Sequence, residues 1–291
     1  MTFRNVLTPY FELTKPRITA LVVITTALGF FMSGGGISDP TLLWTLLGTA
    51  LVSGGAGALN HVWERDADAR MLRTRNRPVA SGRINAARAA VFGLLLIAAG
   101  ASLLYACVNG LAAMLALTSA VLYVGVYTPL KRISWWNTPV GAVPGAIPPL
   151  IGWAGATGSL RPEAWILFFI LFLWQHPHFY AIAQMFADDY RRGGFKMLSV
   201  VDASGYRILR QSLSAALLLV PLSVFPTFTH MAGWGYGVGA LLASSWYLWV
   251  CVKWWLTPTV QEARHVLRVS VFYLPLILGA LMADTLWQRM H

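Results

Sequence analysis

The deciding stretch of this chain reads Asn60-His61-Val62-Trp63-Glu64-Arg65-Asp66-Ala67-Asp68, and it is followed by Arg70, Arg73, Arg75 and Arg77-Pro78. It places an amide and three carboxylates at the end of a long apolar segment, next to a group of arginines. Ionisable residues in or near a bilayer are costly and usually have a function there. Carboxylates bind divalent cations and guanidinium groups bind anions. The stretch therefore predicts a site for a metal ion and a diphosphate.

The composition around this stretch is that of an integral membrane protein. Hydrophobic residues make up 57% of the 291 positions and charged residues 11%, whereas a soluble domain has about 25% charged residues. The 13 Trp and 10 Tyr residues are typical of the aromatic belts at membrane interfaces. Cys107 and Cys251 lie in apolar runs without a metal-binding spacing, which indicates buried thiols.

Nine apolar stretches have about the 20 residues that a helix needs to cross a bilayer. They lie near 18–35, 41–61, 86–107, 110–128, 138–156, 163–186, 211–229, 235–256 and 267–286. The fifth stretch is the least regular, because it contains several Gly and Pro residues. The sequence thus predicts an all-α, polytopic bundle of nine transmembrane helices.

The distribution of basic residues predicts how this bundle is oriented. With a cytoplasmic N-terminus, 20 of the 22 Lys and Arg residues fall on the cytoplasmic side, and only Arg161 and Arg289 fall on the other. Cytoplasmic loops carry such an excess, so the N-terminus is predicted inside and the C-terminus on the opposite side. The net charge of +11 is then a topology signal and does not indicate nucleic-acid binding.

Two cytoplasmic loops, roughly 62–85 and 187–210, follow the second and sixth predicted helices. Both begin with acids and continue with bases. This recurrence four helices apart predicts a single domain over 1–291, built as a pseudo-repeat of helices 1–4 and 5–8 with a ninth helix added.

Asn60, Glu64 and Asp68 are spaced by four residues, which places them on one face of a helix. Their oxygen atoms are hard ligands that suit Mg²⁺. Asp66 is half a turn away from that face and belongs either to an unwound loop or to a pair with a neighbouring arginine. A purely structural alternative for the whole group is that the acids form salt bridges with Arg65 and Arg70.

A second polar group surrounds the sixth predicted helix, where Asp188-Asp189 precedes Arg191, Arg192 and Lys196, and Trp174-Gln175-His176-Pro177-His178-Phe179 lies upstream. A regular helix would place His178 and Asp189 on the same face. The two histidines either contact a ligand or are satisfied by a neighbouring helix.

Other basic and glycine-rich segments are explained without a special site. Lys131-Arg132 and Lys15-Pro16-Arg17 both satisfy the positive-inside pattern by themselves. Gly54-Gly55-Ala56-Gly57 indicates close helix packing. Catalytic motifs of hydrolases and of dinucleotide-binding enzymes are absent from the sequence.

Taken together, these segments resemble the intramembrane aromatic prenyltransferase superfamily, and within it the protohaem IX farnesyltransferase (haem O synthase) branch. The motifs that carry the resemblance span about residues 14–200. They are Thr14–Thr19, Glu64–Asp68, Met71–Pro78, Tyr127–Arg132, Gly145–Trp153, Trp174–Phe179 and Asp189–Leu198. One departure concerns the second acidic motif, where the superfamily has aspartates four residues apart and this chain has Met185 before Asp189.

The resemblance implies farnesyl diphosphate and haem B as substrates, haem O and diphosphate as products, and Mg²⁺ as cofactor. It assigns roles to the polar residues. The implied metal ligands are Asn60, Glu64, Asp68 and Asp189; the implied diphosphate-binding residues are Arg73, Arg77, Lys131, Arg132 and Lys196; the implied haem contacts are His178 and, second to it, His176. It also implies a bacterial cytoplasmic membrane with the site facing the cytoplasm.

Three other functions remain open from the sequence. A quinone or other aromatic prenyltransferase shares the architecture and the first acidic motif, but Glu64 and His176-Pro177-His178 argue against it. A transporter or channel would place charges near the middle of its helices, whereas most charges here lie at helix ends. A haem carrier without catalytic activity would not need the arginine-rich run at 70–77.

Overall fold

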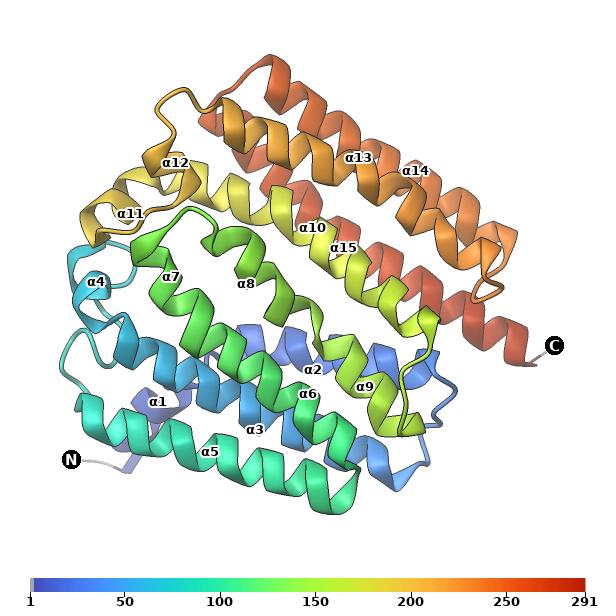
Figure 1. Ribbon diagram of the computed structural model, residues 1–291, viewed down its shortest axis with the longest axis horizontal. Helices are drawn as coiled ribbons and strands as arrows, with labels where there is room; N and C mark the ends of the chain where they lie inside the picture. Colours follow the sequence, from blue (N-terminus) through green and yellow to red (C-terminus); the bar gives the residue numbers. More distant parts are fainter. Residues whose placement is uncertain (1–2, 291) are drawn as a thin grey trace. The chain divides into compact units, whose positions relative to one another are not determined.

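The computed structural model describes residues 3–290, and it is helical without β-strands over that range (Figure 1). The elements are α1 (Phe3–Leu13), α2 (Pro16–Met32), α3 (Pro40–Trp63), α4 (Arg65–Arg70), α5 (Ala86–Cys107), α6 (Gly110–Val121), the π-helix η1 (Leu122–Tyr127), α7 (Thr128–Ile133), α8 (Asn137–Ala146), α9 (Pro148–Thr157), α10 (Pro162–Met185), α11 (Ala187–Gly193), α12 (Leu198–Val201), α13 (Tyr206–Phe228), α14 (Trp234–Leu256) and α15 (Val260–Met290).

Several long helices begin at a short polar side chain that accepts a hydrogen bond from the first turn. Asp39 accepts from the Thr41 backbone N–H at 2.9 Å, and Asn109 accepts from that of Ala112 at 2.9 Å. Such caps satisfy backbone donors that have no partner inside the helix. The cap at Asn109 separates α5 from α6, at the boundary that the sequence predicted between its third and fourth spans.

Seven helices in the described part of the chain are long and apolar enough to cross a membrane, and the bent pair α1–α2 gives an eighth if it counts as one span. The chain is therefore a multi-pass membrane protein, but the predicted count of nine is not confirmed. The predicted fifth span, 138–156, is divided into α8 and α9 of ten residues each. Each is too short to cross alone, because the helix is interrupted before Pro148, which has no backbone N–H to donate.

The chain forms two compact units. The first comprises Met1–Leu160 and Asp188–Lys196, and in it α3 packs along α5. Two glycine pairs allow this approach. A Cβ atom on Gly55 would lie 2.5 Å from the Gly93 carbonyl oxygen, and one on Gly100 would lie 2.6 Å from that of Gly48. The glycines thus bring two backbones together, as is common between membrane helices.

The second unit comprises Arg161–Ala187 and Met197–His291. In it α10 packs against α13 and α15, and α14 packs against the same two helices, so the four helices form a closed ring. Aromatic residues fill part of its core: the Tyr247 and Tyr273 rings stack with centroids 5.1 Å apart, and both side chains are fully buried. The predicted pseudo-repeat of helices 1–4 and 5–8 stays a prediction.

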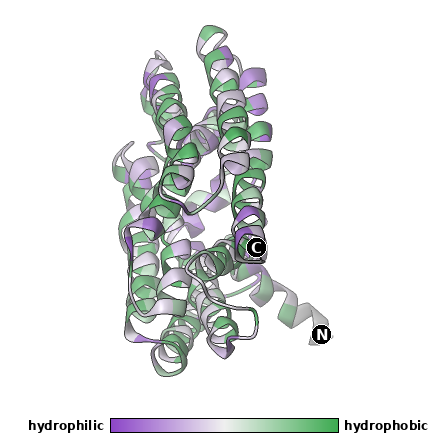
Figure 2. Ribbon diagram, turned by 90° about the vertical axis from the view of Figure 1, so that its right-hand side faces the viewer, coloured by the Kyte–Doolittle hydropathy of each residue, from purple (hydrophilic) through white to green (hydrophobic). Residues whose placement is uncertain are grey.

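Apolar side chains also cover the outer surfaces of the helices. On α5, Val91, Leu94 and Leu95 are each more than half exposed, and Figure 2 shows hydrophobic residues along most of the helices. Large exposed apolar surfaces are rare in soluble monomers. Here they fit contact with lipid, where helices satisfy their backbone polar groups internally.

Candidate active site

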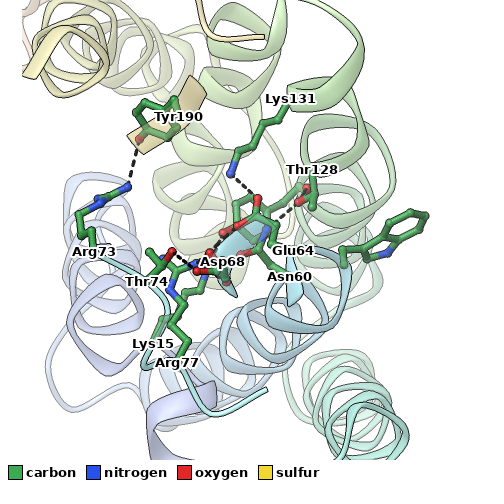
Figure 3. A network of polar contacts seen from close by, with 12 residues as sticks. Lys15, Asn60, Glu64, Asp68, Arg73, Thr74, Arg77, Thr128, Lys131 and Tyr190 are labelled. Atoms are coloured by element: carbon green, nitrogen blue, oxygen red, sulfur yellow. Dashed lines mark hydrogen bonds and ion pairs between the residues drawn. The ribbon is translucent and has the colours of Figure 1, made fainter. Parts of the chain in front are cut away.

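Three of the predicted ligands lie together in the first unit, where α3 ends and α4 begins. Glu64 occupies the break between the two helices, yet its N–H still donates to the Asn60 carbonyl at 3.0 Å, and the Asp68 N–H donates to the Glu64 carbonyl at 2.7 Å. Helical spacing therefore continues through the break. Asn60, Glu64 and Asp68 are 0%, 4% and 0% exposed, and Figure 3 shows their side chains in one group.

Asp66 lies outside this group. Its side chain is 68% exposed and accepts a hydrogen bond from Nε of Arg65 at 2.9 Å. Of the two alternatives that the sequence left open for Asp66, the structure shows the pair with a neighbouring arginine.

Each of the three buried oxygen donors is held by a cationic side chain. Lys131 Nζ donates to Glu64 Oε1 at 2.7 Å, and Arg77 Nη1 donates to both Asp68 oxygens at 2.8 Å. Lys15 Nζ donates to Asn60 Oδ1. We call these six residues, Asn60, Glu64, Asp68, Lys15, Arg77 and Lys131, the inner cluster (Figure 3). It joins the acids of the first motif to bases from three other segments.

Two charged members of the inner cluster, Glu64 and Arg77, are stabilised by the opposite charges beside them. Burial alone would raise the pKa of Glu64, but the ammonium group of Lys131, followed by that of Lys15, lowers it to about 2. Burial alone would lower the pKa of Arg77, but the Asp68 carboxylate raises it above its ordinary value. Glu64 and Arg77 are therefore ionised at neutral pH. A buried charge of either sign is tolerated here because an opposite charge faces it.

Lys15 is a member of the inner cluster that the sequence analysis did not assign to a site, because its charge was attributed to membrane topology. Its backbone has φ 50° and ψ 60°, a left-handed conformation that costs a non-glycine residue about 1 kcal/mol. Pro16 follows and starts α2. Backbone strain of this kind gathers at functional sites. The sequence signals were a lysine directly before a helix-starting proline and its place in the Thr14–Thr19 motif.

The π-helix η1 supplies the wall of the inner cluster. Tyr123 accepts a hydrogen bond from Lys15 Nζ at 3.1 Å through its hydroxyl, and the Tyr127 ring lies 4.3 Å from Lys131 Nζ. Thr128 follows η1 and accepts a hydrogen bond from Asn60 Nδ2 at 2.9 Å. Single π-helical turns are frequent at functional sites, and this one presents two tyrosines four residues apart to the cations.

Asp189 has a different surrounding from the other predicted metal ligands. Its carboxylate accepts hydrogen bonds from the backbone N–H groups of Leu72 at 3.1 Å and Arg73 at 3.3 Å, and from Arg192. Burial raises its pKa, but these hydrogen bonds, that of Arg192 foremost, bring it below its ordinary value. Asp189 therefore holds the arginine loop that follows α4.

Further contacts join the same two segments. Arg70 Nη2 donates to the Gly193 carbonyl at 3.0 Å, and Arg73 Nη2 donates to the Tyr190 hydroxyl at 3.2 Å. We call the residues of these contacts, Arg70, Leu72 and Arg73 with Asp189, Tyr190 and Gly193, the loop clasp. It brings the two loops that the sequence singled out into direct contact.

The remaining predicted bases are less buried. Arg132 is exposed and its Nη2 lies 3.5 Å from the Trp63 carbonyl at the end of α3. Lys196 is exposed, and its backbone N–H donates to the Lys131 carbonyl at 2.7 Å. Asp188 is exposed and pairs with Arg191 at 2.5 Å. The two bases are thus attached near the inner cluster, whereas Asp188 is not part of it.

Both predicted haem contacts lie on α10, in the second unit. His176 Nδ1 is 2.7 Å from the Phe172 carbonyl, and His178 Nδ1 is 2.7 Å from Ser270 Oγ on α15. The continuous helix predicted from His178 to Asp189 is wrong, since α10 ends at Met185 and Phe186 caps it. A new helix, α11, starts at Ala187 and carries Asp189.

The donor set of the inner cluster fits a magnesium ion in its chemistry. No group of three or more His, Cys, Asp and Glu side chains is arranged for a metal within the described residues. The reason is visible in the contacts: one donor is the amide of Asn60, and the carboxylates of Glu64 and Asp68 are held by Lys131 and Arg77. Amide and carboxylate oxygens are nevertheless the ligands that Mg²⁺ prefers.

Sequence comparison gives relatives over nearly the whole chain. A protoheme IX farnesyltransferase from Solibacter usitatus (strain Ellin6076) is 45% identical over 285 residues, which cover 94% of this chain and 98% of the relative. One from Salinibacter ruber (strain DSM 13855 / M31) is 46% identical over 276 residues, with 94% and 98% covered.

Solved structures share the fold at lower identity. A digeranylgeranylglyceryl phosphate synthase structure superposes with a TM-score of 0.83 at 17% identity and covers 97% of this chain and 99% of the other. A UbiA homologue from Archaeoglobus fulgidus bound to DMAPP and Mg²⁺ gives 0.72 at 16% identity, with 95% and 98% covered. The model of the UbiA prenyltransferase family matches residues 22–276. The chain belongs to the UbiA prenyltransferase family.

Proposed function

We propose that this protein transfers the farnesyl group of farnesyl diphosphate to a vinyl group of haem B, which forms haem O and releases diphosphate. The names of relatives at 45% and 46% identity support the substrates. The observation that carries the proposal is the inner cluster, in which Asn60, Glu64 and Asp68 are buried and each faces its own cation. Such a site offers oxygen ligands to a metal and bases to a diphosphate.

The proposed metal ligands are Asn60, Glu64 and Asp68. Bound Mg²⁺ would stabilise the negative charge that develops on the leaving diphosphate oxygen. Lys131 and Arg77, which hold the two carboxylates in this structure, would be free to bind the diphosphate when these carboxylates hold the metal. Arginine suits this role because it contacts phosphate through two parallel hydrogen bonds. The metal-ligand role of Asp189 stays a prediction.

The outer bases complete the proposed diphosphate site. Arg73 is held in the loop clasp, and Lys196 and Arg132 are exposed beside the ends of α7 and α3. Their charges guide a diphosphate from solution towards the inner cluster. This arrangement supports a site that faces the cytoplasm, as the positive-inside pattern predicts.

The transfer balances as an electrophilic alkylation. The bond between farnesyl C1 and the diphosphate oxygen breaks, and diphosphate leaves with the electron pair. C1 then bonds to the terminal carbon of the vinyl group, the inner vinyl carbon takes a hydroxyl group from water, and the remaining proton of that water is released. Aromatic side chains such as Tyr123 and Tyr127 surround the cationic groups, and they limit the access of water to the allylic cation.

The haem acceptor is assigned to the histidines of α10, His176 and His178. We further propose nine membrane crossings, with α1–α2 as one and α8–α9 as another, an inside N-terminus and a bacterial cytoplasmic membrane. The bacterial relatives and the distribution of Lys and Arg support this location.

The function is tested by incubating the purified protein with haem B, farnesyl diphosphate and Mg²⁺ and analysing the haem by mass spectrometry. We expect haem to gain the mass of a farnesyl group and one hydroxyl group. The matched reaction replaces haem B by an aromatic quinone precursor. Prenylation of that acceptor instead of haem would overturn the proposal and assign the chain to another branch of the family.

A further inference from the structure

A cavity of about 240 Å³ lies between α10 and α13 in the second unit. Its lining includes the apolar side chains of Phe172, Leu173 and Leu218. It also includes four polar side chains, those of His176, Arg210, Gln211 and Ser214. The sequence had assigned no role to Arg210 or Gln211. A lining that combines apolar residues with a few polar groups is typical of a ligand site.

His176 is prepared to bind a metal centre. Its Nδ1 lies 2.7 Å from the Phe172 carbonyl oxygen, and a carbonyl oxygen can only accept, so Nδ1 carries the hydrogen. In the neutral ring the lone pair then resides on Nε2. A backbone hydrogen bond that fixes the tautomer in this way is common for histidines that bind metals.

Arg210 and Gln211 offer donors to an anion. The Arg210 guanidinium lies 6.0 Å from the Tyr206 ring centroid, and no acidic side chain pairs with it in the described part of the chain. The hydroxyl of Tyr180, which is fully buried, donates to Gln211 Oε1. This contact fixes the amide so that its nitrogen remains as the donor.

His178 has a different environment, although it lies only two residues from His176. Its Nδ1 contacts Ser270 Oγ at 2.7 Å, and its ring stacks on Trp174 with centroids 4.9 Å apart. Trp174 itself donates to the Ser270 carbonyl at 2.8 Å. His178 therefore belongs to the contact between α10 and α15, and it does not line the cavity.

We propose that this cavity binds the carboxylate-bearing edge of the haem acceptor, with Arg210 and Gln211 on a propionate and His176 Nε2 facing the iron. The proposal rests on the proposed function and adds the site of the acceptor. Haem has an apolar ring, an iron centre and carboxylate groups. These correspond to the apolar residues of the cavity, to the imidazole of His176 and to the hydrogen-bond donors of Arg210 and Gln211. The sequence analysis placed His178 before His176 as the haem contact. This proposal instead assigns the contact with the iron to His176.

The experiment compares ferric protoporphyrin IX with its dimethyl ester, in which both carboxylates are neutral. Binding to the purified full chain is followed through the Soret band. The wild type should bind the free acid about tenfold more tightly than the ester, which is the effect of one hydrogen bond to a charged group. Arg210→Gln should remove this preference, and Arg210→Lys should restore part of it. Arg207→Gln on the same helix, outside the cavity, is the matched control and should keep it.

The histidines are separated by the spectrum of the bound ferric haem. His176→Ala should shift the Soret band, whereas His178→Ala should leave its position unchanged. The inference would be overturned if Arg210→Gln kept the preference of the wild type for the free acid. It would also be overturned if the Soret band shifted only in His178→Ala. Farnesylation of haem by the wild type at saturating haem is measured in parallel. Its absence would reject the proposed function, while its presence with an unchanged Arg210→Gln would reject this cavity alone.

Discussion

The inner cluster and the loop clasp both join acids to bases, but they use their charges differently. In the inner cluster, Glu64 and Asp68 are buried and their partners are side chains that a ligand can displace. In the loop clasp, Asp189 accepts from two backbone N–H groups, which no ligand can remove without unfolding the loop. The first arrangement suits ligand binding and catalysis, and the second suits holding the arginine loop in place.

Asp189 is buried like Glu64 and Asp68, so the two regions differ in the partners of their acids. The cost of breaking a pair still depends on its burial. Removing one partner of a buried ion pair costs about 3–5 kcal/mol, because the other charge is left unpaired. An exposed pair contributes only about 0–1 kcal/mol. Mg²⁺ alone would separate Lys131 and Arg77 from their carboxylates and leave these two cations unpaired. Diphosphate alone would bind the two cations and leave the carboxylates unpaired. We therefore expect the two ligands to bind together more strongly than either binds alone.

The largest effect is expected from Asp68→Asn. The amide keeps the size of the side chain but removes a carboxylate from the proposed metal site, so Mg²⁺-dependent formation of farnesylated haem should fall by at least about 10²-fold. Arg77 is 28% exposed and can be hydrated, so the protein should still fold. Turnover is measured against Mg²⁺ concentration, with thermal unfolding in detergent as the control. Rates like those of the wild type would reject the metal assignment.

The next effect concerns Lys131→Met, which leaves Glu64 buried without its nearest cation. We expect a loss of about 3–5 kcal/mol in stability and weaker inhibition by pyrophosphate. The lowered pKa of Glu64, about 2, means that its ionised form stabilises the wild type above its unfolded pKa of about 4.3 and that this contribution is lost as the pH falls towards 2. The contribution of Glu64 to the stability of the wild type should therefore stay constant from pH 7 to pH 5. The difference between wild type and variant should decrease at lower pH, where Glu64 becomes protonated.

Lys131→Arg is the matched control, since it keeps the charge. Its stability in thermal unfolding should lie close to that of the wild type. A difference between wild type and Lys131→Met that does not decrease as the pH falls towards 2 would contradict the ion pair between Glu64 and Lys131.

The inner cluster could be predicted from the sequence only in part. The spacing of Asn60, Glu64 and Asp68 is a local property of a helix, and the same hydrogen-bond ladder continues through the break at Glu64. Lys15 could not be found in this way, because its contact with Asn60 joins segments 45 residues apart. Its charge also satisfied the topology rule, so the charge gave no separate signal of a site.

The number of spans shows a second limit of sequence reasoning. Hydropathy identified 138–156 as one apolar stretch, but it does not report where a helix is interrupted. The interruption before Pro148 divides it into α8 and α9. For α10 the apolar stretch 163–186 did indicate the end of the helix near Phe186, and the wrong step was to extend a regular helix from His178 to Asp189. Breaks depend on local backbone hydrogen bonds, whereas hydropathy averages over about 20 residues.

A smaller effect is expected from Asp189→Asn, which weakens the loop clasp. Loss of the carboxylate should loosen the backbone of Leu72 and Arg73, raise the KM for farnesyl diphosphate by about tenfold and change kcat little, because the loop positions the diphosphate and leaves the inner cluster intact. Amide hydrogen exchange of the 71–78 segment should become faster. Asp188→Asn, which alters only an exposed pair with Arg191, is the matched control.

This variant also decides the role of Asp189. A fall in kcat as large as that of Asp68→Asn, together with a higher requirement for Mg²⁺, would show that Asp189 binds the metal. In that case the loop clasp would have to open during the reaction, and the contrast between the two regions would not hold.

The smallest effect is expected from Asp66→Asn, two residues from Asp68 in the same acidic run. Asp66 is exposed and forms a salt bridge with the exposed Arg65. Stability should therefore change by less than about 0.5 kcal/mol, and turnover should stay within about twofold of the wild type. The measurement is the Mg²⁺ titration used for Asp68→Asn. Because the two variants make the same chemical change within one helix, a large effect of Asp66→Asn would show that burial in the inner cluster does not decide which acids act.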